Sequence, residues 1–191
     1  DPLWSRGLGD VYKRQELYKV EELRQLTYKD EKAYIQYIQE WYDNDEKVIP
    51  TTTNLKEYHS FKDMVDYINK EKPDKDWVPT TTLFYMIDEN IVGALEIRHE
   101  LNRRLSNIGG HVGYGVAQSY RGKGYAHILL GEALVYLKKL NVKKVRLTTN
   151  PFNFASQKVI KDYEGYEIEP YIKKNGRKVN RYEILLSLIH I

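Results

Sequence analysis

The chain has 191 residues, which fits one domain of ordinary size and leaves too little sequence for a second full core. Hydrophobic residues make up 41% and charged residues 30%, a globular composition that excludes a disordered or fibrous chain. The net charge of +3 arises from 30 basic and 27 acidic residues, so we expect no nucleic-acid partner.

The sequence contains no cysteine, which excludes disulfides, thiolate metal sites and cysteine nucleophiles together. We expect no metal ion, and the absence of cysteine suits a cytoplasmic location. No apolar run approaches the roughly 18 residues that a membrane span needs, and no secretory signal pattern opens the sequence. We therefore expect no membrane association.

Both ends of the chain differ in character from the rest. Residues 1–15 show no apolar periodicity and no initiator methionine, because the first methionine is Met64. Residues 186–191 have a similar character. We predict that both are non-native flanks around a single domain of residues 16–185, with a native flexible arm as the alternative for the start.

The first part of this domain is predicted to be a short strand and two helices. The strand is Glu22–Leu26, and the spacing of Thr27 and Asp30 resembles a capping box that opens a helix. Ser60 and Asp63 repeat this start signal. Apolar side chains then recur with helical period in both segments, at Tyr34, Tyr37, Ile38 and Trp41 and at Phe61, Met64, Val65 and Ile68.

Three strands are expected next. Thr81–Ile87 and Ile91–His99 are rich in β-branched and aromatic residues and flank a short polar turn, which predicts a hairpin. Residues 100–108 are polar and are predicted to be a connection. His111–Val116 is the third strand.

The second half alternates helices and strands. The predicted elements are a helix over Tyr125–Leu140, a strand over Val142–Thr149, a helix over Ala155–Asp162 and a hairpin over Tyr166–Ile184 that turns at Asn175 and Gly176. This order predicts a mixed α/β fold with a largely antiparallel sheet. Its central strand–helix–strand unit should bring its two strands parallel through a right-handed crossover.

Glycine is concentrated where the third strand meets the best helix. Six of the twelve glycines fall between Gly109 and Gly124, although glycine weakens strands and helix starts unless the backbone must approach something closely. Unpaired N–H groups at a helix start favour phosphate or pyrophosphate, and Arg121 and Lys123 add positive charge. A plain tight turn is the alternative, while the glycine spacing fits neither a Walker loop nor a dinucleotide-binding loop.

The segment Arg121-Gly122-Lys123-Gly124-Tyr125-Ala126 resembles the R-x-x-G-x-G/A signature of GNAT N-acetyltransferases, and it stands between a strand and a helix as in that family. Asn153 and Ser156, at the start of the next helix, resemble the second family landmark. Three segments, residues 78–82, 93–102 and 109–114, are similar to a bacterial subgroup of predicted acetyltransferases. The resemblance extends from about Glu22 to Ile184.

This resemblance implies a GNAT-like acyl-CoA N-acyltransferase fold and an enzyme that uses acetyl-CoA as cosubstrate. The acetyl group would pass to a primary amine of a small molecule or peptide by direct attack on the thioester. The pantetheine arm would follow the third strand and the pyrophosphate would lie on the glycine loop. The residues implied in binding are Val116, Ala117, Arg121, Gly122, Lys123, Gly124, Tyr125, Ala126, Asn153 and Ser156. The alternative is a non-catalytic acyl-CoA-binding sensor or regulatory domain. In either case we expect a monomer or a homodimer.

The catalytic side chains are less clearly marked. We predict His111 as general base, because an ordinary histidine pKa is about 6.5 and the residue lies on the strand that should carry the thioester. Glu96 is the second candidate, and a structural role for His111 is the alternative. Many family members carry a tyrosine as general acid where this chain has Ile160. The acid therefore stays open among water, Tyr163 and another of the 17 tyrosines.

Overall fold

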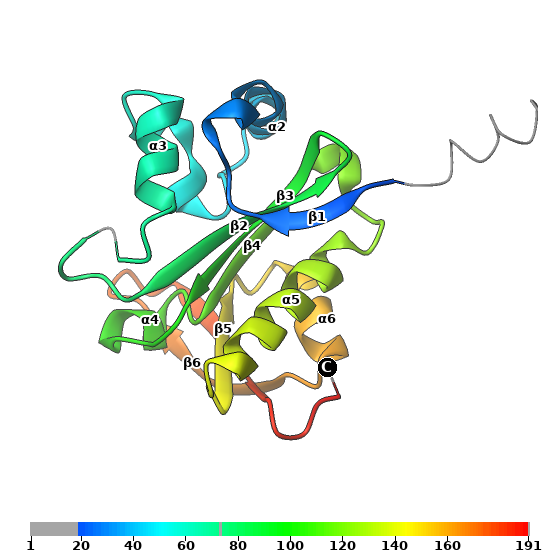
Figure 1. Ribbon diagram of the computed structural model, residues 1–191. Coiled ribbons are helices and arrows are strands. Elements are labelled where there is room, and N and C mark those ends of the chain that lie inside the picture. Colours follow the sequence, from blue (N-terminus) through cyan, green and yellow to red (C-terminus); the bar gives the residue numbers. More distant parts are fainter. Residues whose placement is uncertain (1–18, 73, 191) are drawn as a thin grey trace, which may run out of the picture.

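The computed structural model describes residues 19–72 and 74–190, whose strands form two antiparallel sheets (Figure 1). The first sheet has the order β1-β2-β3-β4, formed by Glu21–Arg24, Thr80–Ile87, Asn90–Arg98 and Val112–Val116. The second has the order β5-β7-β6, formed by Lys144–Thr149, Lys178–Leu185 and Tyr166–Ile172. The predicted mixed α/β, largely antiparallel fold is confirmed.

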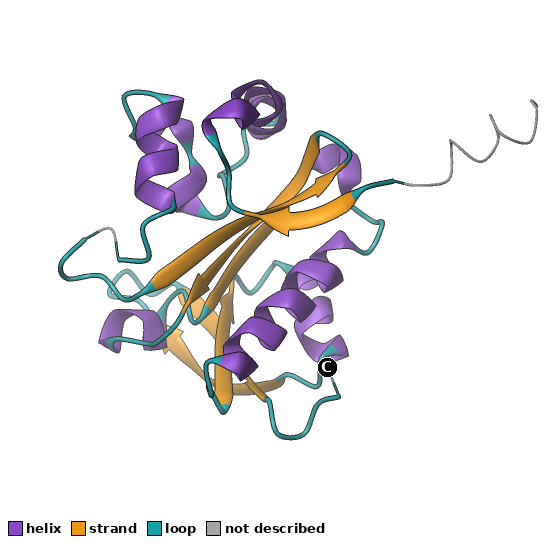
Figure 2. Cartoon of the chain, viewed as in Figure 1, coloured by secondary structure: helices purple, strands orange, loops and turns teal. Residues whose placement is uncertain are grey.

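Helices cover both faces of the first sheet, so that the sheet separates two apolar cores (Figure 2). Helices α2 (Glu31–Asp43) and α3 (Phe61–Ile68) pack on one face, where their predicted apolar stripes are buried against Phe84 and Ala94. Helix α5 (Tyr125–Lys139) packs on the other face, and α6 (Phe154–Asp162) lies beside it. Strand β4, which carries Gly113 and Gly115 at the edge of this sheet, therefore lies between two separate apolar cores.

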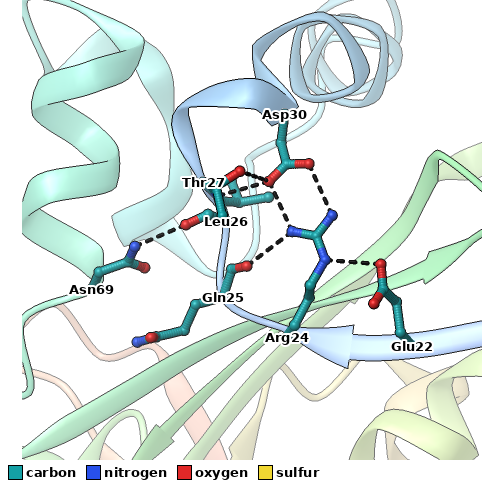
Figure 3. Close-up of polar contacts among 7 residues, drawn as sticks. All are labelled: Glu22, Arg24, Gln25, Leu26, Thr27, Asp30 and Asn69. Carbon is teal, nitrogen blue, oxygen red and sulfur yellow. Dashed lines mark hydrogen bonds and ion pairs between the residues drawn. The ribbon is translucent and has the colours of Figure 1, made fainter.

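The connection from β1 to α2 shows why the first helix begins where the sequence predicts (Figure 3). The Asp30 carboxylate accepts the N–H of Thr27 at 2.7 Å, and two nitrogens of the Arg24 guanidinium donate to its oxygens at 2.8 and 2.9 Å. This ion pair lowers the pKa of Asp30 to about 2. The Asn69 side chain then ties α3 to this turn by donating to the carbonyl of Leu26 at 2.8 Å.

One local prediction is incomplete. The polar connection after β3 contains a short helix, α4 (Arg103–Asn107), whose start is capped by the Asn102 side chain accepting the N–H of Leu105 at 2.9 Å. The structure also has four short 3-10 turns, over Tyr28–Asp30, Thr51–Thr53, Leu55–Glu57 and Gln118–Tyr120. One helical turn needs only a cap and a few bonds, so it leaves no periodicity in the sequence.

The expected parallel pairing across the strand–helix–strand unit is not formed. Helix α5 connects β4 to β5, but these strands belong to different sheets. Within the described residues, the only ladder contact there is one isolated antiparallel bridge, between Gly110, just before β4, and Leu147 of β5. The two sheets therefore diverge from that bridge, and the edge of β4 beyond it has no neighbouring strand.

The predicted flanks have different outcomes. Residues 1–15 lie outside the described residues. Leu186 and Ile189 of the other flank are buried in the core between the two sheets, and the N–H of Leu186 donates to the carbonyl of Lys143 at 3.0 Å. The segment after β7 therefore packs as part of the fold.

Candidate active site

A cavity of about 650 Å³ lies where the end of β4 meets the starts of α5 and α6. Its lining includes Val116, Arg121, Gly122, Gly124 and Ser156, and we call it the glycine-loop cavity. It brings together most of the residues that the sequence predicts as cofactor-binding, from two helix starts that are about 30 positions apart in the chain.

The glycine loop requires glycine at two positions. Gly122 and Gly124 have φ angles of +72° and +87°, in the left-handed region that other residues adopt only at a cost of about 1–2 kcal/mol. A Cβ atom built on either residue would meet nothing within 4 Å. The space beside these residues is therefore open to a ligand, and the backbone conformation, not packing, explains the two glycines.

Five consecutive backbone amides of this loop have no acceptor among the described residues, those of Gly122, Lys123, Gly124, Tyr125 and Ala126. The next two N–H groups, of His127 and Ile128, already donate to the carbonyl of Gly124. The free amides stand at the positive end of the α5 dipole, which favours an anion. This geometry suits a pyrophosphate group.

The two basic side chains of the loop act differently from the prediction that they simply add charge. Arg121 Nη1 donates to Glu46 at 2.9 Å, and Nε donates to the carbonyl of Val116 at 3.0 Å, while the guanidinium lies 5.3 Å from the centre of the Trp41 ring. Arg121 thus fixes the loop to the end of β4. Lys123 Nζ donates to the carbonyl of Ser119 at 2.9 Å and folds back along the loop.

The free edge of β4 presents every second residue to solvent or ligand. The bonds from Ala117 N to the carbonyl of Val92 and from Arg98 N to the carbonyl of His111 bracket the β3–β4 ladder. Alternation between them directs the backbone groups of Gly113 and Gly115 toward β3 and those of Tyr114 and Val116 away from it. The N–H of Val116 is consequently available at this edge.

Ala117 differs from Val116, because both of its backbone groups have partners. Its N–H donates to Val92 at 2.9 Å, and its carbonyl accepts the N–H of Tyr120 at 2.9 Å. The sequence could not distinguish these neighbouring residues without the register of the ladder.

The start of α6 contributes a tyrosine contact that the sequence did not reveal. The Asn153 side chain caps the helix by accepting the N–H of Ser156 at 3.2 Å, and Ser156 Oγ lies 2.9 Å from the hydroxyl of Tyr114. Burial raises the pKa of Tyr114, partly offset by this hydrogen bond. Tyr114 therefore stays protonated near neutral pH and faces the glycine-loop cavity.

The positions considered for the general acid have different environments. Ile160 is fully buried in the core between the two sheets. The hydroxyl of Tyr163 donates to the carbonyl of His127 at 2.9 Å, and Tyr163 lines neither this cavity nor the one described next. Ser156 lies one helical turn before Ile160 on the same face of α6, so the Tyr114 hydroxyl reaches the neighbourhood that a tyrosine at position 160 would occupy.

A second cavity, of about 1220 Å³, lies beside the other half of β4. Its lining includes Thr52, Glu96, Arg98, Gly113 and Thr149, and we call it the Glu96 cavity. It shares only Lys47 and Ile49 with the glycine-loop cavity. The edge of β4 thus runs from one cavity to the other.

Glu96 is a buried carboxylate in this second cavity, with 1% of its surface exposed. One oxygen lies 2.5 Å from Arg98 Nη2, and the other accepts a hydrogen bond from the hydroxyl of Thr52. Glu96 is paired with Gly113 on β4, so no side chain from that residue covers it. The carboxylate is accordingly held in place by Arg98 and Thr52 in the wall of the cavity.

His111 lies where the two sheets meet. Its backbone N–H donates to the carbonyl of Arg146 at 2.8 Å, and its ring Nδ1 accepts the N–H of Arg146 at 2.9 Å. Accepting through Nδ1 places the ring proton of the neutral form on Nε2. Burial lowers the pKa of His111 to about 4, and the residue lines neither cavity.

Within residues 19–72 and 74–190 no group of three or more His, Cys, Asp and Glu residues is arranged to hold a metal ion. In the same residues, no helix has the length and apolar character needed to cross a membrane.

Comparison with known proteins gives one consistent family. The sequence model of the Acetyltransferase (GNAT) family matches residues 15–166. None of the curated proteins compared with the chain matches it in sequence.

Several solved structures share the fold. RimJ from Mycobacterium smegmatis, in complex with CoA-disulfide, has a TM-score of 0.66 at 17% identity and covers 90% of this chain and 85% of its own. The dodecameric spermidine N-acetyltransferase SpeG from Vibrio cholerae has a TM-score of 0.60 at 22% identity and covers 87% and 94%. A GNAT-family acetyltransferase from Streptococcus pneumoniae has a TM-score of 0.57 at 16% identity and covers 87% and 99%.

A free strand edge beside a helix start with unpaired amides, on this two-sheet fold, defines the class of acyl-CoA-dependent acyltransferases. The family match is more specific: the chain belongs to the GNAT family of acetyltransferases. It is an N-acetyltransferase that uses acetyl-CoA as cosubstrate, and the comparisons give no support to a non-catalytic sensor.

Proposed function

We propose that the enzyme transfers the acetyl group of acetyl-CoA to a primary amine by direct attack of the amine on the thioester. The observation that carries this proposal is the free edge of β4, which runs from the glycine-loop cavity to the Glu96 cavity. A donor lying along this edge would have its phosphates at one end and its acetyl group near the other.

The residues at the glycine-loop cavity fit acetyl-CoA. Five free amides and the start of α5 suit its pyrophosphate, and the open space beside Gly122 and Gly124 leaves room for it. The free edge of β4 suits the pantetheine arm, although the carbonyl of Val116 already accepts a hydrogen bond from Arg121 Nε, so that only the N–H of Val116 is left for the donor. Arg121 holds this edge and the loop in place, and Asn153 and Ser156 shape the opposite wall. We leave Ala117 out, because its backbone groups are already paired.

We assign the proton transfers to side chains near the junction of the two cavities. Glu96, directly or through one water, takes a proton from the ammonium form of the acceptor, so that the neutral nitrogen attacks the carbonyl carbon. The N–H of Val116 stabilises the negative charge that develops on the carbonyl oxygen. As the C–S bond breaks, the thiolate takes the hydroxyl proton of Tyr114, and the phenolate so formed takes the remaining extra proton of the attacking nitrogen, which leaves a neutral amide, a thiol and a protonated Tyr114.

Glu96 is placed before His111 in this proposal for two geometric reasons. Glu96 lines the cavity in which an acceptor fits, whereas the free lone pair of His111 is used by the N–H of Arg146. A ring nitrogen that already carries a proton cannot accept another from the amine. The base role of His111 stays a prediction.

We also propose a single domain that begins at residue 16, whose core extends past the predicted boundary of residue 185 to Leu186 and Ile189. A cytoplasmic location is proposed because the sequence has no cysteine. A monomer or a homodimer is proposed as the oligomeric state of the enzyme. The spermidine named for SpeG is not transferred to this chain, because identities of 22–23% support the fold alone.

The first experiment tests donor binding. Gly124→Glu should abolish CoA binding, since the new carboxylate would lie among amides that bind phosphate and would force a side chain into the left-handed conformation. Gly176→Glu is the matched control, because Gly176 has a φ of +77° and equally open surroundings but lies in the β6–β7 turn. Titration calorimetry with CoA and with ATP measures both variants.

The outcomes of this titration separate the possible ligands. Loss of CoA affinity in Gly124→Glu alone, at an unchanged melting temperature relative to Gly176→Glu, supports the assigned donor site. Equal binding of ATP and CoA by the unmodified chain would indicate a general nucleotide site. Equal CoA affinity in both variants would place the donor elsewhere.

A further inference from the structure

The Glu96 cavity carries a strong excess of positive charge. Its lining contains the acidic residues Asp74 and Glu96 and seven basic residues, namely Lys47, Lys70, Arg98, Arg104, Lys173, Arg177 and Lys178. Removing these nine from the totals leaves 23 basic and 25 acidic residues for the rest of the sequence. The small net charge of the chain therefore hides a local concentration at one cavity.

Most of these cations lack a counter-ion. Arg98 is paired with Glu96, but the other six form no ion pair with any residue of the described chain. The two acidic groups are already used, because the Asp74 carboxylate accepts the hydroxyl of Tyr67 at 2.6 Å. The positive potential of the cavity is not neutralised from within.

The basic residues reach the cavity from separate parts of the fold. Lys47 follows α2, Lys70 follows α3, Arg104 is in α4, and the remaining three belong to the turn between β6 and β7 and its borders. A solvated basic face usually arises from one helix or strand with repeated charges. Here four segments with no sequence relation direct like charges at one hollow, which requires a reason because like charges repel.

Two further features of the lining favour a bound polar group. The guanidinium of Arg104 lies over the ring of Trp77, 5.9 Å from its centre, which restricts its position at the cavity rim. The Thr149 hydroxyl is buried and has no hydrogen-bond partner among the described residues. A planar guanidinium and a free hydroxyl are suitable partners for a carboxylate or phosphate.

We propose that the acceptor is an amine that also carries an acidic group, a carboxylate or a phosphate, and not a polyamine. This proposal rests on the proposed function of the site. The acceptor nitrogen would lie at Glu96, and its acidic group would lie toward the basic rim formed by Arg104, Arg177 and their neighbours. The distance across a cavity of about 1220 Å³ is similar to the Debye length of about 8 Å at physiological salt. The charges of the rim therefore still attract an acidic group whose amine lies at Glu96.

The test uses acceptors that share a skeleton and differ in charge. The pairs are 4-aminobutyrate with 1-aminobutane and phosphoethanolamine with ethanolamine, and 1,4-diaminobutane and spermidine serve as cationic acceptors. Thiol release from acetyl-CoA gives kcat/KM for each. We expect the acidic member of at least one pair to exceed its neutral partner by about tenfold or more, with an advantage that shrinks as salt is raised.

A charge-reversal variant locates the recognising group. Arg104→Glu combined with Arg177→Glu should lower the ratio of kcat/KM between the acidic acceptor and its neutral partner by about tenfold. The matched control is Lys138→Glu combined with Lys139→Glu, at the exposed end of α5 and outside both cavities. CoA affinity is measured for both double variants. Weaker donor binding would lower kcat/KM equally for the two acceptors and would leave their ratio unchanged.

Each result has one meaning. A preference for the acidic acceptor that the rim variant removes and the control retains supports the proposal, and the carboxylate and phosphate arms identify the group. Turnover of spermidine or of the neutral amines at equal or higher efficiency overturns it while leaving the acetyltransferase assignment intact. CoA binding without thiol release for any acceptor overturns the proposed transfer reaction and this inference together.

Discussion

The two cavities at the edge of β4 differ in the groups that they offer to a ligand, backbone groups in one and side chains in the other. The glycine-loop cavity offers backbone groups, namely five free amides and one strand edge, which come from a short continuous stretch of sequence. The Glu96 cavity offers side chains from α3, β2, β3, α4, β5 and the β6–β7 turn. A ligand that all family members share can be held by backbone geometry, whereas a particular acceptor has to be recognised by variable side chains.

The largest expected effect tests the side-chain end. Glu96→Gln should lower kcat by about 10² to 10⁴, the usual contribution of general-base catalysis, while CoA affinity is unchanged because the donor is held by backbone at the other cavity. Glu183→Gln is the matched control, since Glu183 is also a buried, ion-paired carboxylate but lies on β7 outside both cavities. Initial rates and CoA titration measure the two variants.

His111→Gln provides the opposing outcome. Its amide oxygen can still accept the N–H of Arg146, so the junction of the sheets is retained. If this variant loses the activity that Glu96→Gln keeps, and with it the acidic limb of the pH–rate profile, the base is His111. Melting temperatures of all variants distinguish a catalytic loss from unfolding, because removing one partner of a buried ion pair destabilises the fold.

A smaller effect is expected on the free energy of unfolding, through His111 at the junction of the two sheets. The pKa of His111 is lowered to about 4 by burial, while an unfolded histidine titrates near 6.5. The unfolded chain then binds more protons between these values, so the free energy of unfolding should fall by up to about 3 kcal/mol as pH falls from 6.5 to 4. Urea unfolding of His111→Gln should lack this component, whereas His59→Gln, at an exposed histidine, should retain it.

The smallest effect on kcat is expected from the proposed proton donor, Tyr114. Tyr114→Phe should lower kcat by about tenfold, less than a base variant, because a thiolate is a good leaving group and needs only modest help from a proton. Tyr163→Phe is the control, as its hydroxyl bonds to the carbonyl of His127 away from both cavities. Equal rates for the two variants would leave water as the proton donor.

The sequence indicates the local backbone conformation of the glycine loop and of the helix starts. Gly122 and Gly124 occupy left-handed positions at a helix start, and local constraints of that kind leave a readable pattern. Ser60 and Asp30 likewise mark the helix starts that the structure contains. The order of strands and helices followed from apolar periodicity, and only the short α4 and the separation of β4 from β5 escaped it.

The side-chain part could not be predicted in the same way. Tyr114 joins Ser156 across 42 positions, and Thr52 joins Glu96 across 44, so no local spacing indicates either contact. His111 was predicted from residue type and strand position, and its partner Arg146 became visible only with the junction of the sheets. The basic rim is assembled from separate segments, and acidic residues elsewhere in the chain nearly cancel its charge in the total composition.

The loop at Ile49 has a consequence for the order in which molecules arrive and depart. Its carbonyl lies so close to β4 that a Cβ on Gly115 would stand 2.3 Å from it, and beside this contact the two cavities share only Lys47 and Ile49. Each cavity also has exposed lining residues of its own, such as Gly124 on one side and Arg177 on the other. Under the proposed assignment, donor and acceptor would enter through separate openings, so that neither would have to wait for the other to bind or for the other's product to leave.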